Sequence, residues 1–280
     1  MDSDNLQMLN AGLAKLDRNW NWNDIGSPFT RIYCVTQGCA WIIINNRKTE
    51  LRPGHLYIIP AFTQHSYECD GPFEHFYLHI YEKQRCGDSI FDQYELPTEI
   101  RATTTDIELF EAICRRNPDS TLPAFNPEVY DNSSSLADFA RRFDALGEAE
   151  KMFIRGAVMI LLSRFIDQSR YRNPKPDNRL QAVMNYIDAH LDSAIELDCL
   201  AAEAGMSKAY LIRLFRQSFD MTPLAYVNKR RMEKAQLLLI TTDMPVKEIA
   251  YTLGFADCSY FNRLFKKQTG RTPQSYRVRN

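Results

Sequence analysis

Cationic side chains alternate with aliphatic and aromatic ones near the end of this chain, in the segment GFADCSYFNRLFKKQTGRTPQSYR (254–277). On a helix through this segment, Ser259, Asn262, Arg263 and Lys266 share one side, opposite an apolar side. Lysine and arginine bind phosphates, and arginine or asparagine can hydrogen-bond base edges in the major groove of DNA. The pattern favours a DNA-binding helix, although a single helix of this kind can also be a solvated charged face.

A shifted copy of this segment, AGMSKAYLIRLFRQSFDMTPLAY (204–226), occurs earlier in the chain. An offset of 50 residues aligns Arg213 with Arg263 and Phe215 with Phe265, and an offset of 49 aligns Gly205 with Gly254. So many matches with a single one-residue slip indicate a duplicated structural unit.

Each copy predicts two helices joined by a tight turn. Gly205 and Gly254 can adopt the left-handed conformation that ends the first helix, and Ser207 and Asp257 can cap the second. Two helices joined by a short turn that contains glycine form a helix-turn-helix motif.

The second helix of each copy has an apolar side and a polar, cationic side. The predicted core residues are Leu211, Leu214, Phe215, Phe261, Leu264 and Phe265. In the first copy the opposite side carries Ala209, Ile212, Arg213 and Arg216. Ile212 can contact a thymine methyl group.

The charge of the chain is unevenly distributed. From Met206 onward there are 14 Lys/Arg against 5 Asp/Glu, whereas the whole chain has a net charge of -1. Such asymmetry indicates a nucleic-acid partner for the basic part. Between the copies, residues 222–243 predict a helix opened by Pro223. About 17 helical residues span about 25 Å, so this helix can hold the two units about one DNA turn apart, near 34 Å.

The stretch from about Leu180 to Arg277 resembles the DNA-binding domain of the AraC/XylS family. The segment IAYTLGFADCSYFNRLFKKQTGRTPQSYR matches that family's signature nearly residue for residue. The resemblance implies a monomeric, bipartite reader of promoter DNA, in which one chain carries both units. It favours an activator, with RNA polymerase as a further partner. The polar start of the chain and the lack of a long apolar run indicate that it stays in the cytoplasm.

The reading positions that the resemblance implies are Ala209, Ile212, Arg213, Arg216, Cys258, Ser259, Tyr260 and Arg263. Ser207, Asn262 and Lys266 complete the predicted DNA-binding residues. Ala209 and Ile212 are short or apolar where family members often have longer polar groups, so the first unit is expected to read DNA by apolar contact and shape.

The N-terminal part predicts a run of short strands separated by turn residues. The expected strands are TRIYCV, CAWIIIN, KTEL, HLYIIP, QHSYEC and EHFYLHIY, between residues 30 and 81. Asn45-Asn46, Pro53-Gly54 and Asp70-Gly71-Pro72 mark turns. This spacing favours a small antiparallel barrel or sandwich. Residues 51–65 resemble the second motif of the cupin barrel, in which Gly54, Pro60 and His65 fall at the matching positions.

A barrel of this size can hold one small ligand. The predicted effector-binding residues are Arg31, Tyr33, Trp41, His65, Tyr67, His75 and Tyr77. Alternation places His75, Tyr77 and His79 on one face of their strand. The strands QHSYEC and EHFYLH resemble those of sugar-sensing members of the family, which makes a sugar one candidate effector.

Two alternatives remain open. One is a cupin-type enzyme attached to a DNA-binding domain, and the other is a regulator that senses no small molecule or that senses a partner protein. The segment where the first cupin metal motif would lie, GCAWIIINNRKTEL, has no histidine, and metal sites need three or more protein ligands. We therefore predict no metal, no cofactor and no catalytic residues.

The overall expectation is an α+β protein with two domains. Residues 1–172 are predicted to be a cupin-like effector-binding and dimerisation domain with a helical segment, and residues 173–280 an all-α domain with two helix-turn-helix units. RYRNPKPDN (170–178) is the expected linker. The segments DIELFEAICRR, SSLADFARRFDAL and EAEKMFIRGAVMILLSRFIDQSR predict helices that either pack on the barrel or pair in a homodimer.

The remaining sequence features set limits on the class of protein. The seven cysteines are scattered and form no CxxC pair, which argues against a disulfide framework and a zinc site. No apolar run of about 18 residues predicts a membrane span. The start, MDSDNLQMLN, is polar and acidic, unlike a signal peptide.

Overall fold

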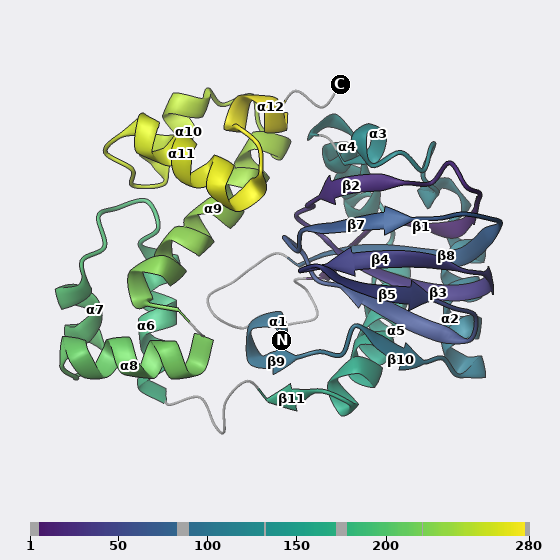
Figure 1. The fold of residues 1–280 in the computed structure, drawn as a ribbon, viewed down its shortest axis with the longest axis horizontal. Coiled ribbons are helices and arrows are strands. Elements are labelled where there is room, and N and C mark those ends of the chain that lie inside the picture. Colours follow the sequence, from purple (N-terminus) through teal and green to yellow (C-terminus); the bar gives the residue numbers. More distant parts are fainter. Residues whose placement is uncertain (1–5, 83–89, 132, 172–177, 220, 278–280) are drawn as a thin grey trace. The chain divides into compact units, whose positions relative to one another are not determined.

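The computed structural model describes residues 6–82, 90–131, 133–171, 178–219 and 221–277. They form two compact units (Figure 1). One contains residues 6–82 and Leu96–Ser169, and the other contains residues 90–95 and Arg170–Arg277. Most of the predicted linker, with the predicted boundary at 172–173, lies outside the described residues.

The first unit, which we call the sensor unit, contains two antiparallel sheets. One sheet has the strand order β1-β8-β3-β6-β10 and the other β2-β7-β4-β5. The strands of the first sheet are β1 (Leu6–Leu16), β8 (Phe73–Glu82), β3 (Thr30–Gly38), β6 (His55–Ile59) and β10 (Glu99–Arg101). Those of the second are β2 (Trp22–Ile25), β7 (His65–Glu68), β4 (Ala40–Ile44) and β5 (Arg47–Leu51).

The six predicted strands correspond to β3 to β8, and the predicted fold class is confirmed. Asn45 and Asn46 both have positive φ, at 50° and 61°, and they form the two-residue turn between β4 and β5. Gly54 has φ 76° in the turn before β6. Asparagine and glycine adopt this left-handed conformation more readily than other residues, so they fix these hairpins locally.

Strand β1 was not predicted, although it pairs with β8 along its whole length. Eight of its eleven residues are buried, but its sequence LQMLNAGLAKL contains none of the β-branched and aromatic residues that mark the predicted strands. Its outer face is covered by α2 (Thr104–Arg116), α4 (Ser133–Asp144) and α5 (Glu148–Asp167). These three helices are the predicted ones, and they pack on the sensor unit together with the short α3 (Pro127–Tyr130).

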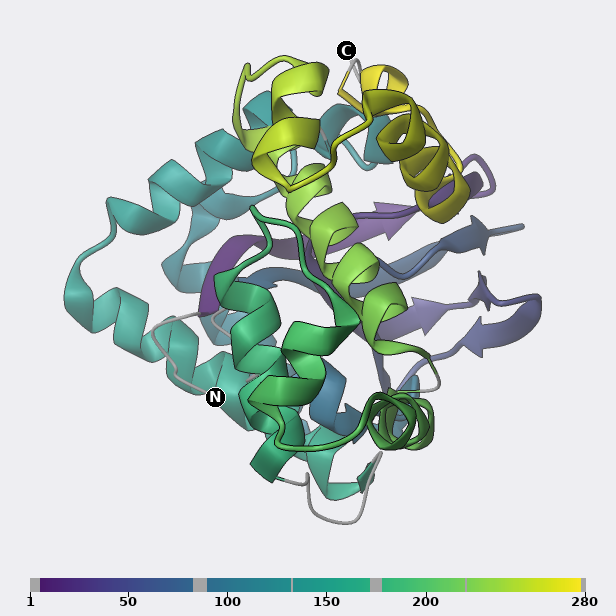
Figure 2. The same ribbon diagram turned by 90° about the vertical axis from the view of Figure 1, so that its left-hand side faces the viewer.

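The second unit, which we call the helical unit, contains the two predicted helix-turn-helix copies. Its main helices are α6 (Asn178–Ala189), α7 (Leu197–Glu203), α8 (Lys208–Phe219), α9 (Pro223–Thr241), α10 (Val246–Thr252), α11 (Cys258–Thr269) and α12 (Pro273–Arg277). It also includes α1 (Ile90–Gln93) and the paired short strands β9 (Tyr94–Glu95) and β11 (Arg170–Tyr171). Helix α9 runs between the copies, with α10 to α12 at its C-terminal end (Figures 1 and 2).

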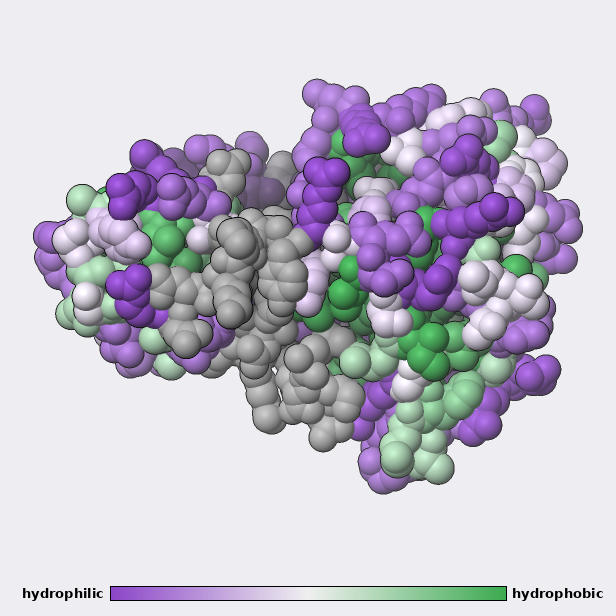
Figure 3. All heavy atoms as spheres, turned by 90° about the horizontal axis from the view of Figure 1, so that it is seen from below, coloured by the Kyte–Doolittle hydropathy of each residue, from purple (hydrophilic) through white to green (hydrophobic). Residues whose placement is uncertain are grey.

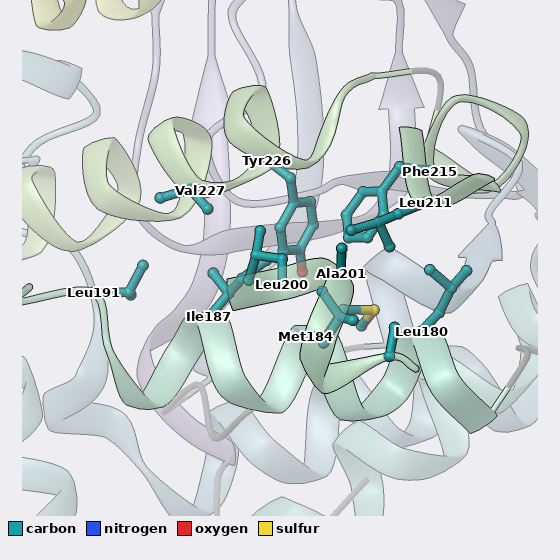
Figure 4. Packing of buried hydrophobic residues seen from close by; sticks show 12 residues of the cluster. Leu180, Met184, Ile187, Leu191, Leu200, Ala201, Leu211, Phe215, Tyr226 and Val227 are labelled. Atoms are coloured by element: carbon teal, nitrogen blue, oxygen red, sulfur yellow. The ribbon is translucent and has the colours of Figure 1, made fainter. Parts of the chain in front are cut away.

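The core of the first copy is built from four helices. Side chains of α6, α7, α8 and α9 point toward one another, among them Ile187, Leu200, Phe215 and Tyr226 (Figure 4). Phe215 meets Tyr226 edge-on, with ring centroids 5.8 Å apart. The matching pair of the second copy, Phe265 and Tyr276, has the same geometry at 5.3 Å. The repeat in the sequence is therefore also a repeat in the packing.

The surface of the described residues mixes polar and apolar side chains. On the side shown in Figure 3, hydrophobic residues gather in patches on the part that contains the sheets. Within the described ranges, no helix is both long and apolar enough to span a bilayer.

Candidate nucleic-acid interface and effector site

The two turns between helices have the same backbone geometry. Gly205 has φ 59° and Gly254 has φ 70°. The Met206 N–H donates to the Ala201 carbonyl at 3.0 Å, and the matching bond closes the second turn at the same distance. This is the Schellman motif, in which a left-handed residue satisfies the last carbonyls of a helix.

The second helix of each copy begins at the predicted cap. The Ser207 hydroxyl accepts from the Tyr210 N–H at 3.3 Å, and the Asp257 carboxylate accepts from the Ser259 N–H at 2.8 Å. These bonds satisfy backbone donors that have no partner within the helix. The turn and the cap together set the direction in which α8 and α11 leave the turn.

The structure exposes most of the predicted DNA-binding side chains. Phe215 and Phe265 are fully buried, whereas Leu214 and Leu264 are partly buried. The exposed members of the predicted set are Ser207, Ala209, Arg213, Arg216, Ser259, Tyr260, Arg263 and Lys266. The partly buried members are Ile212, Cys258 and Asn262. The set therefore lies on the outer faces of α8 and α11, although Ser207 also serves as a cap.

The cations on these faces are available for a ligand. In the part of the chain that the structure describes, Arg216, Arg263 and Lys266 form no ion pair with a carboxylate. Arg213 lies with its guanidinium carbon 4.9 Å from the ring centroid of Tyr210, which orients the side chain without neutralising it. Unpaired cations on two repeated helices are suited to a polyanion.

Two cations counted in the basic excess of the sequence are buried. Arg230 is 6% exposed, and its Nε lies 3.0 Å from Asp188 Oδ1. Arg231 is 7% exposed and donates to backbone carbonyls. The positive charge available on the surface is therefore smaller than the sequence count indicates.

The inner face of the first sheet of the sensor unit is polar. Strand register places Asn10 opposite His79, and His79 opposite Arg31. The next row of the same face contains Tyr77 opposite Tyr33. Opposite residues of antiparallel strands point to the same side, so these side chains enter the space between the sheets together.

The second sheet contributes the predicted His65 and Tyr67 from β7. His65 Nε2 lies 3.1 Å from the Tyr67 hydroxyl, and that hydroxyl is 2.7 Å from the hydroxyl of Tyr33 on the first sheet. Trp20 stacks on the Tyr67 ring at 4.2 Å. The predicted Arg31, Tyr33, His65, Tyr67, His75 and Tyr77 are all buried in this interior.

Trp41 does not belong to this group, contrary to the prediction. Ile42 lies opposite Tyr67 and shares its inward face, whereas Trp41 lies opposite Glu68 on the other face of the sheet. There its ring contacts the Lys48 ammonium at 4.7 Å. The error arises because one residue of register reverses the face of a strand residue.

Residues that the sequence analysis missed close one side of this interior. Arg31 Nη2 donates to the Ser27 hydroxyl at 2.6 Å, Ser27 hydrogen-bonds to Asp131, and the Arg31 and Asp131 charges lie 3.7 Å apart. The Leu122 N–H donates to the Tyr77 hydroxyl at 2.8 Å. Only the three-dimensional structure brings the segment 121–131 next to β3 and β8.

Several buried polar atoms of this interior have no hydrogen-bond partner among the described residues. They are both side-chain polar atoms of Asn10, both ring nitrogens of His79, Nδ1 of His75 and Nε of Arg31. Buried polar groups are normally paired, because an unpaired one costs free energy. A bound polar molecule would supply these partners. No three His, Cys, Asp or Glu side chains among the described residues are grouped as metal ligands.

Burial also holds the imidazoles neutral. It lowers the pKa of His75 to about 3, and burial together with the Arg31 charge lowers the pKa of His65 to about 3. Burial moves the pKa of His79 in the same direction. The interior therefore offers imidazoles that both donate and accept hydrogen bonds at neutral pH.

These shifts predict a dependence of stability on pH. The unfolded chain takes up protons below about pH 6.5, whereas folded His65 and His75 stay neutral down to about pH 3, so stability is full above pH 6.5 and falls as the pH drops. At pH 5 we expect each histidine to lower the free energy of unfolding by about 2 kcal/mol relative to pH 7.5.

Urea unfolding of wild type and His75→Phe at both pH values measures this effect. The variant should lose less stability between pH 7.5 and 5. As a control, Phe73→Leu alters the ring that stacks on His75 and should lower stability equally at both pH values. Equal pH dependence of wild type and His75→Phe would contradict the assignment of this pH dependence to buried, neutral His75.

A sandwich with a polar interior, together with a duplicated helix-turn-helix unit, defines a protein that has separate ligand-binding and nucleic-acid-binding parts. Comparison with known families agrees. Residues 17–165 match the AraC-like ligand binding domain, and residues 200–279 match a helix-turn-helix domain. The chain belongs to the AraC/XylS family of transcription regulators.

Individual relatives match parts of the chain. The arabinose operon regulatory protein of Escherichia coli K12 is 35% identical over 131 residues, which are 46% of this chain and 45% of that protein. The chain thus spans about half the length of this relative. Regulatory protein SoxS of Salmonella typhimurium is 37% identical over 100 residues, which are 36% of this chain and 94% of that protein. The structure of ToxT from Vibrio cholerae O395 shares the fold, with a TM-score of 0.57, 14% identity and coverage of 99% of this chain and 98% of ToxT.

Proposed function

We propose that this protein binds promoter DNA and controls transcription in response to a small molecule held in the sensor unit. The observation that carries the proposal is the pair of equivalent cationic faces on α8 and α11, each set by a Schellman turn and a capped helix start. The named relatives, a regulator of the arabinose operon and a regulatory protein, support it. We assign no catalytic role to any residue.

The two faces would enter successive major grooves. Helix α9 has 19 residues, so it spans about 28 Å and suits two half-sites about one turn of DNA apart. Arg213, Arg216, Arg263 and Lys266 supply phosphate and base contacts. Ala209 and Ile212 on α8, and Cys258, Ser259, Tyr260 and Asn262 on α11, complete the contact surface.

The interior of the sensor unit is suited to a small, neutral, hydroxylated effector. Its unpaired atoms include both donors and acceptors, and a hydroxyl group can satisfy either kind. Among the described residues, the charges that we find facing this space are those of Arg31 and Asp131, and they already form an ion pair. A sugar has this chemistry, and the name of the arabinose operon regulator supports the same class. In the cytoplasm, such a regulator would respond to the supply of its effector.

The test combines DNA and effector measurements. Purified protein should shift a promoter fragment from its own genome at moderate salt, and that fragment should compete better than random DNA of equal length. A panel of sugars should contain one that raises the melting temperature, because a ligand that binds only the folded state stabilises it. If no genomic fragment outcompetes random DNA, the proposed DNA recognition is wrong.

We further propose that the protein is a homodimer joined through α5. The outer side of this helix exposes Met152 at 70% and Ile160 at 47%, with the small residue Gly156 between them. These positions follow one another every four residues, so they form one stripe. Exposed large apolar side chains in a stripe are typical of a helix that pairs with another copy.

Replacing Met152 and Ile160 together by aspartate should convert the dimer into a monomer, because the paired helices would then bury like charges. Sedimentation velocity measures the change. Glu148→Gln and Lys151→Gln at the start of α5, which remove the ion pair between these two side chains, serve as the control and should leave the dimer intact. A monomeric wild-type protein, or a double variant that stays dimeric, would contradict the interface.

A further inference from the structure

Arg231 lies where three parts of the helical unit meet. It is on α9, between the two helix-turn-helix copies, and its side chain is 7% exposed. Its Nε donates to the Leu191 carbonyl at 3.1 Å, and its Nη2 donates to the Ser193 carbonyl. Both carbonyls belong to the loop between α6 and α7, so Arg231 ties α9 to the first copy.

The same guanidinium also contacts the second copy. Its carbon lies 5.2 Å from the ring centroid of Phe255, the residue that follows the turn glycine Gly254. A Cβ atom at Gly254 would come within 2.7 Å of Arg231 Nη2 and 2.8 Å of the Ser193 carbonyl. The turn of the second copy thus approaches the loop of the first so closely that only glycine fits between them.

This junction is specific to the second turn. Gly205, the equivalent residue of the first copy, has the same left-handed backbone, but a Cβ atom there would have no neighbour within 4 Å. The close approach at Gly254 is therefore not a requirement of the helix-turn-helix motif itself. It is an added contact between copies.

The guanidinium group suits such a junction because of its shape. It is planar, its donors point in fixed directions, and its face can stack on an aromatic ring. Burial disfavours the Arg231 charge and so lowers its pKa, and nearby Asp192 partly offsets the effect. The two carbonyls and the Phe255 ring compensate this cost only while both copies stay in place. Movement of one copy would leave a buried charge with fewer partners.

We propose that Arg231 is a positioning residue that locks the two helix-turn-helix copies together and thereby sets the half-site spacing that the protein accepts. The inference rests on the proposed DNA binding. Because Arg231 is buried and already bonded, it is not itself a DNA contact. One inserted base pair moves a half-site by about 3.4 Å and turns it by about 35°, which a locked pair of copies cannot follow.

The experiment measures spacing tolerance with the full-length protein. Fluorescence anisotropy gives the affinity for a promoter fragment with its native spacing and for the same fragment with one base pair inserted between the half-sites. Wild type should lose affinity by at least about tenfold on insertion, as expected when one half-site loses its contacts. Arg231→Met keeps an apolar side chain but removes the guanidinium group and its hydrogen bonds. Its affinity should fall by less than about threefold when the base pair is inserted.

Two further comparisons test whether the effect depends on the position of the guanidinium group rather than on its charge or on strain in the turn backbone. Arg231→Lys keeps the charge without the planar fork, so it should also lose spacing discrimination. Gly254→Ala should lose discrimination through the steric clash, whereas Gly205→Ala, which strains an equivalent turn without a clash, should keep it. If Arg231→Met, Arg231→Lys and Gly254→Ala all keep the wild-type discrimination, or if wild type accepts both spacings equally, the proposal is wrong.

Hydrogen exchange of the same proteins tests the junction without DNA. In Arg231→Met, amides of residues 190–195 and 253–257 should both exchange faster, although they belong to different copies, while the cores of α8 and α11 keep their protection. Faster exchange of only one of the two segments would show that Arg231 supports one copy alone. If no promoter fragment is bound, the proposed function is contradicted. The exchange result would still test whether Arg231 joins the two copies.

Discussion

Arg263→Ala is expected to weaken binding to a genomic promoter fragment by about 10- to 100-fold, which is the loss typical of one arginine that contacts a base. Arg263 is exposed on α11, between Ser259 and Lys266 on the same face, and no carboxylate among the described residues neutralises it. Fluorescence anisotropy at several salt concentrations measures the effect.

The salt dependence distinguishes two roles for Arg263. If the side chain binds a phosphate, affinity falls for every sequence and the slope of log affinity against log salt decreases by about one. If it reads a base, the loss is confined to sequences with the preferred base at that position. Arg47→Ala, an exposed arginine on β5 of the sensor unit, should bind like wild type. Wild-type affinity of Arg263→Ala would remove α11 from the proposed interface.

Asp131→Ala is expected to lower the free energy of unfolding of the sensor unit by about 3 to 5 kcal/mol, because it leaves the Arg31 charge buried and unpaired. Both side chains are 1% exposed, and their charged atoms lie 3.7 Å apart. A change of this size corresponds to a melting temperature lower by roughly 10 °C in a unit of this length. Differential scanning calorimetry measures the transition.

A double variant tests whether the loss of stability comes from leaving one buried charge unpaired. Arg31→Met combined with Asp131→Leu should recover most of the loss, since a buried ion pair can often be replaced by apolar groups at little cost. The exposed pair of Lys48 and Glu68 provides the matched control, and Glu68→Ala should cost less than about 1 kcal/mol. If Asp131→Ala and Glu68→Ala cost the same, the buried pair does not stabilise the closed side of the interior.

The predictions that hold at the level of secondary structure rest on local signals. Strands β3 to β8 contain many β-branched and aromatic residues, and turn residues such as Asn45-Asn46 and Pro53-Gly54 separate them, so residues a few positions apart define them. The helix-turn-helix copies rest on apolar spacing, a turn glycine and a capping side chain, all within about 20 residues. Strand β1 lacks such a signal, because its neighbours in space rather than in sequence make it a strand.

The interior of the sensor unit shows the same division. Alternation identifies His75, Tyr77 and His79 as one face, because side chains of a strand point to opposite sides in turn. Alternation alone cannot say which face is inward, and Trp41 is on the outer one because of its register with Glu68. Asp131 lies 100 residues from Arg31 in the chain, and no local sequence pattern predicts their pairing.

By itself, the sequence determined the repeated helix-turn-helix units, their cationic faces and the family to which the chain belongs, because spacing and residue type along one helix carry this information. Only the tertiary structure decided which arginines are free and which are buried. Arg263 and Arg231 look alike in the sequence, yet one is exposed on α11 and the other joins two copies through carbonyls of a distant loop. The role of a charged side chain depends on the groups that the folded chain brings within hydrogen-bonding distance of it, and these groups come from segments far apart in the sequence.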